Sequence, residues 1–175
     1  IYIVLYLILL LTSTVDIFPE IEKKNKLYIL FICVVVLTLF RGLRWQTGTD
    51  WDQFYYCFEN VEWSNLTSYD RYGDGTERME VGYMVLNRVI RIFGDYTLFL
   101  ILTNLFLVGT WAILSYKLVP QKPIMTFSLI VVSNMFFPVR LQLAVGFFVW
   151  ALYALYKKKF IMAFLIAFLS YYIHK

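Results

Sequence analysis

The residues with the clearest chemical potential follow a long apolar run and interrupt it abruptly. They lie in the stretch Arg44–Tyr55, which reads RWQTGTDWDQFY. It holds two carboxylates two residues apart, an arginine six residues before the first, and a Gly-Thr pair between them. A carboxylate can accept a proton, and an arginine can grip phosphate through two parallel N–H bonds. The stretch predicts a catalytic or binding site where a membrane helix reaches water.

The two carboxylates of this stretch are Asp50 and Asp52. Aspartate commonly caps a helix, so either one could cap a following helical turn from Trp51 to Phe58. Because the Gly-Thr pair comes directly before Asp50, we assign the catalytic role to Asp50. Asp52 is the better candidate for the cap or for a merely solvated position.

Three further candidates come from distant segments. Glu80 stands on the polar side of an amphipathic segment, where it could pair with Arg88 or Asn87, or act as a base in a partly dry cavity. Arg140 has no carboxylate near it in sequence, and an arginine at the bilayer centre costs roughly 2.5–3.5 kcal/mol on insertion scales. Snorkelling to the interface is the alternative for this arginine. His174 is the only histidine. It could act as an acid or base or bind phosphate, and the alternative is a structural role.

The composition is typical of a membrane protein. Of 175 residues, 61% are hydrophobic and 16% charged, with a mean hydropathy of +0.66. Ordinary soluble domains are nearer half apolar and a quarter charged. The net charge of +4 is explained by lysines that hold loops in the cytoplasm, so no nucleic-acid partner is expected. The two cysteines have no metal-ligand spacing.

The apolar residues form runs, which predict an all-α polytopic membrane helical bundle. We expect a single transmembrane domain over 1–175 and an outer-face loop over 41–95 that contains an interfacial amphipathic helix at 79–93. The chain begins inside one apolar run and stops directly after another, so we expect the N-terminal part of a longer protein. About six transmembrane segments are predicted, several of them shorter than the usual ~17–25 residues. They are 1–18, 27–40, 96–116, 124–137, 141–156 and 160–173.

Alternating these six segments across the membrane separates lysine from arginine. The loops at 19–26, 117–123 and 157–159 hold eight of the nine lysines, and all seven arginines fall on the other side. The positive-inside rule makes the lysine side cytoplasmic. An outer face rich in arginine suits a lipid-linked phosphate or pyrophosphate ligand. The alternative is that these arginines pair with the nine acidic residues of 41–95.

Several short motifs, taken in order, resemble the EpsG family of membrane proteins, which is similar to Wzy-type oligosaccharide repeat-unit polymerases. One departure is Leu141, because the family's arginine is commonly followed directly by glutamine. The matching pieces are Arg44, Gly48-Thr49-Asp50-Trp51 with Tyr55, Glu80-Val81-Gly82-Tyr83, Leu86-Asn87, Arg140-Leu141-Gln142-Leu143-Ala144 and His174.

The resemblance implies a GT-C-like fold and a membrane glycosyltransferase in exopolysaccharide, capsule or O-antigen biosynthesis. Such an enzyme joins undecaprenyl-pyrophosphate-linked oligosaccharide repeat units at the outer leaflet of the bacterial cytoplasmic membrane. No cofactor is expected, because the donor is already activated. Expected partners are this lipid-linked glycan, the lipid bilayer, and other polysaccharide-assembly proteins such as a flippase or a chain-length regulator.

On this resemblance, Asp50 or Glu80 takes the proton of the acceptor hydroxyl, and Arg140 stabilises the departing pyrophosphate. Arg44 or Arg88 assists Arg140, and His174 binds phosphate or an acceptor hydroxyl. The residues expected to bind substrate are Arg44, Trp45, Gly48, Thr49, Trp51, Tyr55, Arg88 and Gln142.

Three other functions fit a polytopic membrane chain. A flippase or transporter for a lipid-linked glycan would need a polar path through the membrane, and the segments offer few polar residues at mid-depth. A membrane O-acyltransferase that modifies the polysaccharide would normally draw its acyl donor from the cytoplasm, where the lysine side carries no candidate catalytic group. A scaffold subunit is the third alternative.

Overall fold

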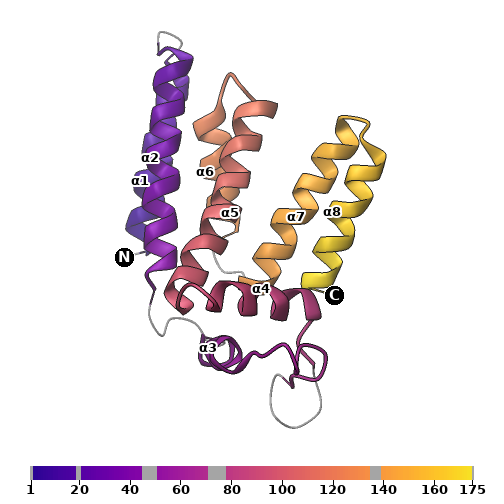
Figure 1. Ribbon diagram of the computed structural model, residues 1–175. Coiled ribbons are helices and arrows are strands. Elements are labelled where there is room, and N and C mark those ends of the chain that lie inside the picture. Colours follow the sequence, from indigo (N-terminus) through magenta and orange to yellow (C-terminus); the bar gives the residue numbers. More distant parts are fainter. Residues whose placement is uncertain (1, 19–20, 45–50, 71–77, 135–138, 175) are drawn as a thin grey trace. The chain divides into compact units, whose positions relative to one another are not determined.

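The computed structural model describes residues 2–18, 21–44, 51–70, 78–134 and 139–174 (Figure 1). Within these ranges the chain is all-α, as predicted, and the only extended pairing is an isolated bridge between Asp70 and Arg78. All six apolar segments form helices. The helices are α1 Tyr2–Ser13, the 3-10 helix η1 Thr14–Ile17, α2 Lys23–Gly42, α3 Trp51–Asn60, α4 Val81–Arg91, α5 Tyr96–Leu118, α6 Pro123–Ser133, α7 Val139–Tyr156 and α8 Phe160–Ile173.

Three of these helices are long and apolar enough to cross a membrane. They are α2, α5 and α7, with 20, 23 and 18 residues. At 1.5 Å per residue, about 20 residues cover a hydrocarbon core of about 30 Å. The other three apolar helices, α1, α6 and α8, have only 12, 11 and 14 residues. The described residues therefore contain three candidate spans, and six transmembrane segments are not shown.

The chain divides into two compact units. Unit 1 comprises Ile1–Phe40 and Asn104–Phe137, and unit 2 comprises Arg41–Thr103 and Pro138–Lys175. The helices α2 and α5 each contribute one part to each unit.

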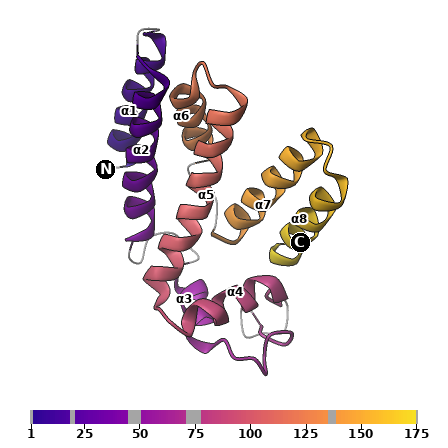
Figure 2. The same ribbon diagram turned by 45° about the horizontal axis from the view of Figure 1, so that its top comes forward.

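In unit 1 the helix α6 packs beside α1, and α2 runs in the opposite direction to α1 (Figure 2). Its core is apolar and continuous, and it joins residues from every helix of the unit. Burying large aliphatic and aromatic side chains in this way accounts for most of the stability of such a core. The core residues are Tyr6, Leu9, Leu30, Val34, Leu37, Leu107, Val108, Trp111, Ala112, Phe127 and Val131.

A buried ion pair closes one end of unit 1. The Nζ atom of Lys26 lies 3.3 Å from Asp16 Oδ1, and it also donates to the carbonyl of Gln121 at 3.2 Å. Asp16 Oδ2 accepts the backbone N–H of Met125 at 2.8 Å. Met125 is in the first turn of α6, whose own N-cap residue, Lys122, makes no side-chain cap. Asp16 thus accepts a hydrogen bond from a backbone N–H in the first turn of α6, although it lies in a distant part of the chain.

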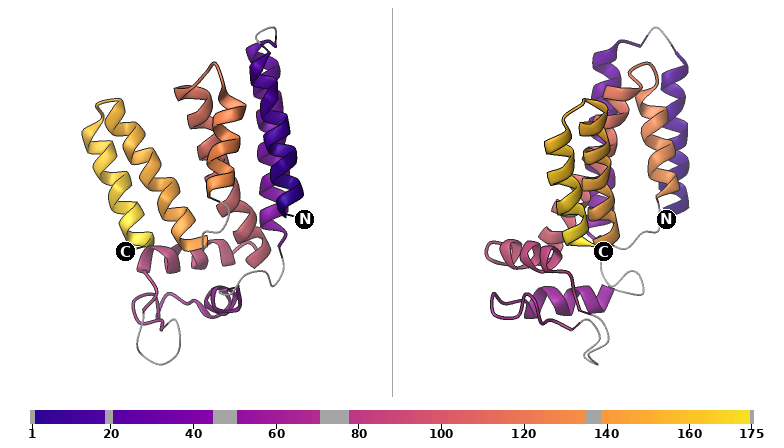
Figure 3. Two further views of the ribbon diagram at one scale, coloured as in Figure 1. Left: turned by 180° about the vertical axis from the view of Figure 1, so that it is seen from behind. Right: turned by 90° about the vertical axis from the view of Figure 1, so that its right-hand side faces the viewer.

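Unit 2 contains the α7–α8 hairpin (Figure 3). Small side chains face the partner helix, which allows the two backbones to approach closely. Ser170 donates a hydrogen bond to the carbonyl of Ala144 at 2.7 Å across this interface. The turn between the helices carries the lysine triplet, with Lys158 at a positive φ of 58°. The buried small residues of the hairpin are Ala144, Gly146, Ala151, Ala154, Ala163 and Ser170.

An aromatic cluster holds α3 against α4 and the first turns of α5. Trp51 and Tyr55 of α3 stack with ring centroids 4.9 Å apart, and both rings meet Tyr96 edge-on at 5.6 Å. Tyr83 of α4 meets Phe99 of α5 at 5.8 Å. Such aromatic pairs add directional contacts to the area that they bury.

The amphipathic helix α4 is shorter than the predicted 79–93, and the side that faces the protein carries Tyr83, Met84, Asn87 and Ile90. Asn87 is fully buried, and Glu80 just before the helix is 8% exposed. The opposite, apolar side is open at Val89 and Ile92, which are 40% and 64% exposed. A helix with its apolar side outward suits a membrane interface, as the sequence predicts.

Candidate functional site

The close approach of α4 to α8 brings the site residues together. A Cβ atom at Gly82 would lie 2.6 Å from the carbonyl oxygen of Tyr172, closer than real Cβ contacts occur. Only glycine therefore allows the first turn of α4 to rest on the last turn of α8. Glu80 precedes this turn of α4, and His174 follows the last turn of α8. The contact at Gly82 thus sets the separation of the two side chains.

The site is a buried cluster of Glu80, Arg140 and His174. Arg140 Nη1 donates to Glu80 Oε2 at 2.6 Å, and the two side chains are each 7% exposed. His174 Nδ1 lies 3.3 Å from Glu80 Oε1 and is 27% exposed in its side chain. Three of the four residues predicted to be catalytic therefore meet, although 34 to 94 positions of sequence separate them.

This cluster corrects the expectation for Glu80. One alternative was a pairing with Asn87 or Arg88, seven and eight residues away on the same segment. Asn87 instead donates to the carbonyl of Tyr83 at 2.7 Å, and Glu80 bonds Arg140. Glu80 is the N-cap residue of α4, but its side chain makes no cap hydrogen bond to that helix, and its two carboxylate oxygens contact Arg140 and His174 instead.

Three helix ends converge on this cluster. Glu80 caps the N-terminus of α4, Arg140 is the second residue of α7, and His174 caps the C-terminus of α8. A helix N-terminus carries a partial positive charge and a C-terminus a partial negative charge. The ends of α4 and α7 therefore favour an anion.

The contact with Glu80 also selects a tautomer for His174. An ionised carboxylate only accepts hydrogen bonds, so the Nδ1 atom must carry the proton in this contact. In a neutral imidazole the lone pair is then on Nε2. His174 can therefore accept a proton or a hydrogen bond at Nε2 while Glu80 orients the ring.

Two sulfur atoms border the arginine. Arg140 Nη1 lies 3.7 Å from Met79 Sδ, and Cys57 Sγ lies 3.3 Å from Met84 Sδ. Burial raises the pKa of the Cys57 thiol to about 12, although the positive charge of Arg140 acts in the opposite direction. Cys57 is therefore a neutral, buried packing residue of the site wall.

Three other arginines of unit 2 interact with groups outside the Glu80 cluster. Arg91 Nη1 donates to the carbonyl of Val61 at 3.1 Å and ties the end of α4 to the end of α3. The Arg88 guanidinium lies 5.9 Å from the centroid of the Trp63 ring. Arg44 acts electrostatically on Tyr96, within the aromatic cluster. Arg44 and Arg88 are therefore associated with aromatic rings.

The other predicted site residues are divided between buried positions and positions outside the described ranges. Trp51 is 6% exposed in the aromatic cluster and Gln142 is 7% exposed on α7, whereas Tyr55 is half-buried beside Trp51. Asp52 is exposed in the first turn of α3, which agrees with the solvated alternative. The remaining four, Trp45, Gly48, Thr49 and Asp50, lie outside the described residues.

The described residues contain no group of three His, Cys, Asp or Glu side chains that could hold a metal ion. Sequence reasoning missed the buried pair of Asp16 and Lys26. The signal that could have found it was a carboxylate inside an apolar run, because such a group nearly always has a partner. It also missed Met79 and Cys57 beside Arg140, for which the sequence carries no signal.

A family model for the EpsG family matches residues 26–175, which is most of the chain. The chain belongs to the EpsG family. This family is generally associated with polysaccharide synthesis. No curated protein and no solved structure gives a match to this EpsG family chain. The family match includes every candidate site residue, all of α5 and α7, and α2 from Lys26 onward.

Proposed function

We propose that this EpsG family protein is a polysaccharide polymerase. It joins undecaprenyl-pyrophosphate-linked oligosaccharide repeat units in exopolysaccharide, capsule or O-antigen biosynthesis. The observation that carries the proposal is the buried contact of Glu80 with both Arg140 and His174. Such a cluster combines an anion-binding group and a proton acceptor, which are the two groups that glycosyl transfer from a pyrophosphate requires.

The reaction is a substitution at the anomeric carbon of the donor glycan. An acceptor hydroxyl oxygen attacks this carbon while the bond to the pyrophosphate oxygen breaks. The lipid pyrophosphate leaves with the electron pair, and the hydroxyl proton passes to a base. Negative charge grows on the leaving group, so a fixed cation there stabilises the transition state more than the ground state.

Arg140 is the proposed cation for this leaving group. Its guanidinium offers five N–H donors in a planar fork that matches two phosphate oxygens. Its place in the first turn of α7 adds the partial positive charge of that helix end. Arg44 and Arg88 are the proposed supporting cations for the second phosphate.

Glu80 is proposed to position Arg140 and His174. Both of its oxygens are engaged, one by each partner, so it would have to release a contact before it could take a proton. The proposed base is therefore His174, through Nε2, or Asp50. The aromatic residues Trp45, Trp51 and Tyr55 are proposed to border the path of the glycan.

The charge pattern along the spans supports an outward-facing site. The helix α2 starts at Lys23 and has Arg41 in its last turn. The helix α7 has Arg140 in its first turn, and Lys157 follows its end. These two spans thus have a lysine end and an arginine end, and the positive-inside rule assigns the lysine end to the cytoplasm. Arg140 and His174 then face the outer leaflet, where activated lipid-linked repeat units are available.

The test is to analyse lipid-linked and surface glycans in a strain that lacks the gene. A polymerase defect gives single repeat units on lipid in the outer leaflet and no long chains. Re-expression of the wild-type chain should restore long polymer, and the His174→Ala form should not. Single units trapped in the inner leaflet would instead identify a flippase, and full-length unmodified polymer a decorating enzyme. Either result would overturn the proposal.

A further inference from the structure

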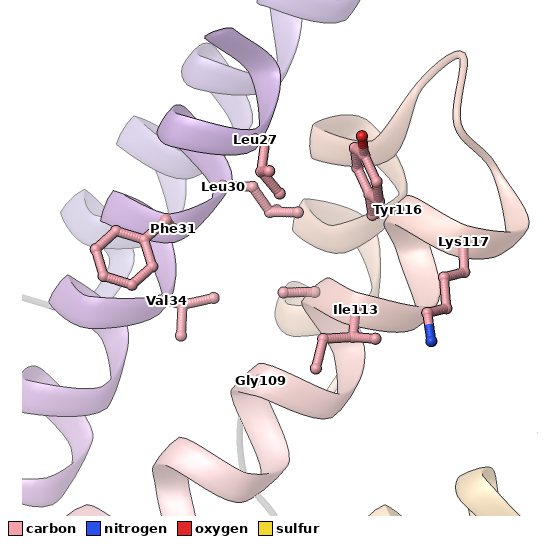
Figure 4. A pocket seen from close by; sticks show the side chains of 9 residues that line it. Leu27, Leu30, Phe31, Val34, Gly109, Ile113, Tyr116 and Lys117 are labelled. Carbon is pink, nitrogen blue, oxygen red and sulfur yellow. The ribbon is translucent and has the colours of Figure 1, made fainter. Parts of the chain in front are cut away.

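Unit 1 contains an apolar groove between α2 and α5 with a cavity volume of about 270 Å³ (Figure 4). Its walls are aliphatic and aromatic except at one end, where Tyr116 and Lys117 stand on α5. Leu30 forms a buried part of the wall, while Phe31 and Ile113 are 64% and 44% exposed. The groove is thus open toward the surroundings of two candidate membrane spans. It lies entirely in unit 1 and includes none of the residues of the Glu80 cluster.

We infer that this groove binds one acyl chain of an anionic phospholipid, with the lipid phosphate near Lys117. The first argument is depth. From Gly109 to Lys117 the groove follows eight residues of α5, which is about 12 Å at 1.5 Å per residue. One leaflet contributes about half of a hydrocarbon core of ~30 Å. The groove therefore matches the depth of one leaflet, with the lysine at the headgroup level.

The second argument is charge complementarity. Lys117 is exposed at the groove's polar end, and Lys23 and Lys24 are exposed in the first turn of α2. A lysine near the surface attracts an anionic lipid headgroup, and tyrosine is common at this level of the membrane. A zwitterionic headgroup has no net charge, so the same ammonium groups would attract it less strongly.

The third argument is the open space at Gly109. A Cβ atom there would meet no other atom within 4 Å, so the missing side chain leaves room that the protein itself does not fill. The atoms that line such an open space lack dispersion contacts on that side. A flexible hydrocarbon chain restores those contacts, which a rigid ring ligand would do less well in a narrow groove.

The test uses phosphatidylglycerol with a photoreactive diazirine in one acyl chain, added to the full-length protein in detergent. Cross-links are expected on the groove segments 27–34 and 109–117. Unlabelled phosphatidylglycerol should compete about fivefold better than phosphatidylethanolamine, since one lysine at the surface contributes about 1 kcal/mol. Equal competition by the two lipids, or cross-links spread evenly over the exposed side of α8, would overturn the inference.

Three variants sharpen this test. Gly109→Leu fills the groove and should lower cross-linking about tenfold, because several methylene contacts are lost. Lys117→Gln should remove most of the preference for phosphatidylglycerol while retaining cross-linking. The matched control Lys122→Gln removes an exposed charge outside the groove and should change the preference by less than about twofold. If the wild-type protein forms a dimer without bound lipid, and Gly109→Leu dissociates that dimer, the inference is overturned. The groove would then be occupied by a second copy of the chain.

Discussion

At the scale of single residues, the pair of Arg140 and Glu80 is the most constrained feature of this EpsG family protein. Removing one partner of a buried ion pair leaves an uncompensated charge and costs about 3–5 kcal/mol. A neutral substitution would therefore combine a folding defect with any catalytic defect. Conservative substitutions that keep the charge separate the two effects.

Arg140→Lys keeps the positive charge but loses the planar fork. We expect the variant to fold and to polymerise repeat units at least about tenfold more slowly, because one phosphate contact in the transition state is lost. The measurement is the initial rate of chain growth in membranes supplied with lipid-linked repeat units. Arg91→Lys, at a guanidinium that bonds the Val61 carbonyl, is the matched control and should remain close to the wild-type rate. A wild-type rate for Arg140→Lys would refute the bidentate role.

The Cys57 thiol should resist alkylation in the folded protein. It is fully buried, and burial favours the neutral thiol and raises its pKa to about 12. The thiolate is the reactive form, and at pH 8 only about one thiol in 10⁴ would be ionised. In a Cys33→Ser background, a water-soluble maleimide should label Cys57 only after denaturation. Labelling of the folded chain at the rate of a free thiol would contradict the buried position.

At the scale of elements, α4 connects the interface with the site. Val89 is exposed on one side of the helix, while Asn87 on the other side and the N-cap residue Glu80 are buried. The helix can therefore lie with Val89 toward the membrane while it holds Glu80 close to His174 at the end of α8. Its approach to α8 depends on the absence of a side chain at Gly82.

Gly82→Ala should separate α4 from α8. The new methyl group would lie 2.6 Å from a backbone oxygen, so one helix must move. We expect loss of the contact between Glu80 and His174, a stability loss of about 1–3 kcal/mol, and lower polymerisation activity. The measurements are thermal unfolding in detergent and chain growth in membranes. Val89→Ala, on the exposed side of the same helix, is the control. Unchanged activity in Gly82→Ala would show that this close approach does not set the site.

At the scale of the whole molecule, the charge pattern predicts one orientation in the membrane. Single cysteines at Ser64 and Lys158, in a background with Cys33 and Cys57 replaced by serine, can report the side of each loop. An impermeant maleimide should label position 64 in intact spheroplasts and position 158 only after permeabilisation, as the positive-inside rule requires. Labelling of position 158 in intact spheroplasts would reverse the assigned orientation.

The sequence by itself determined the features that depend on local pattern. Each apolar run forms a helix, because unbroken apolar residues in a membrane must satisfy their backbone bonds internally. The family membership was also predicted correctly, and the helical turn expected at 51–58 and the amphipathic helix expected at 79–93 correspond to α3 and the shorter α4. Segment length was less informative, since only three of the six runs became helices of spanning length.

Only the tertiary structure decided which side chains meet. Glu80 could not be assigned to Arg140 from sequence, because nearby Arg88 and Asn87 were equally plausible partners by spacing. Asp16 and Lys26 pair because the α1–α2 hairpin folds back on itself, which no local pattern encodes. The stretch from Arg44 to Tyr55 remains a predicted part of the site through Asp50. Long-range contacts of this kind depend on how helices pack, and helix packing depends on the shapes of surfaces from distant segments, such as the bare backbone at Gly82.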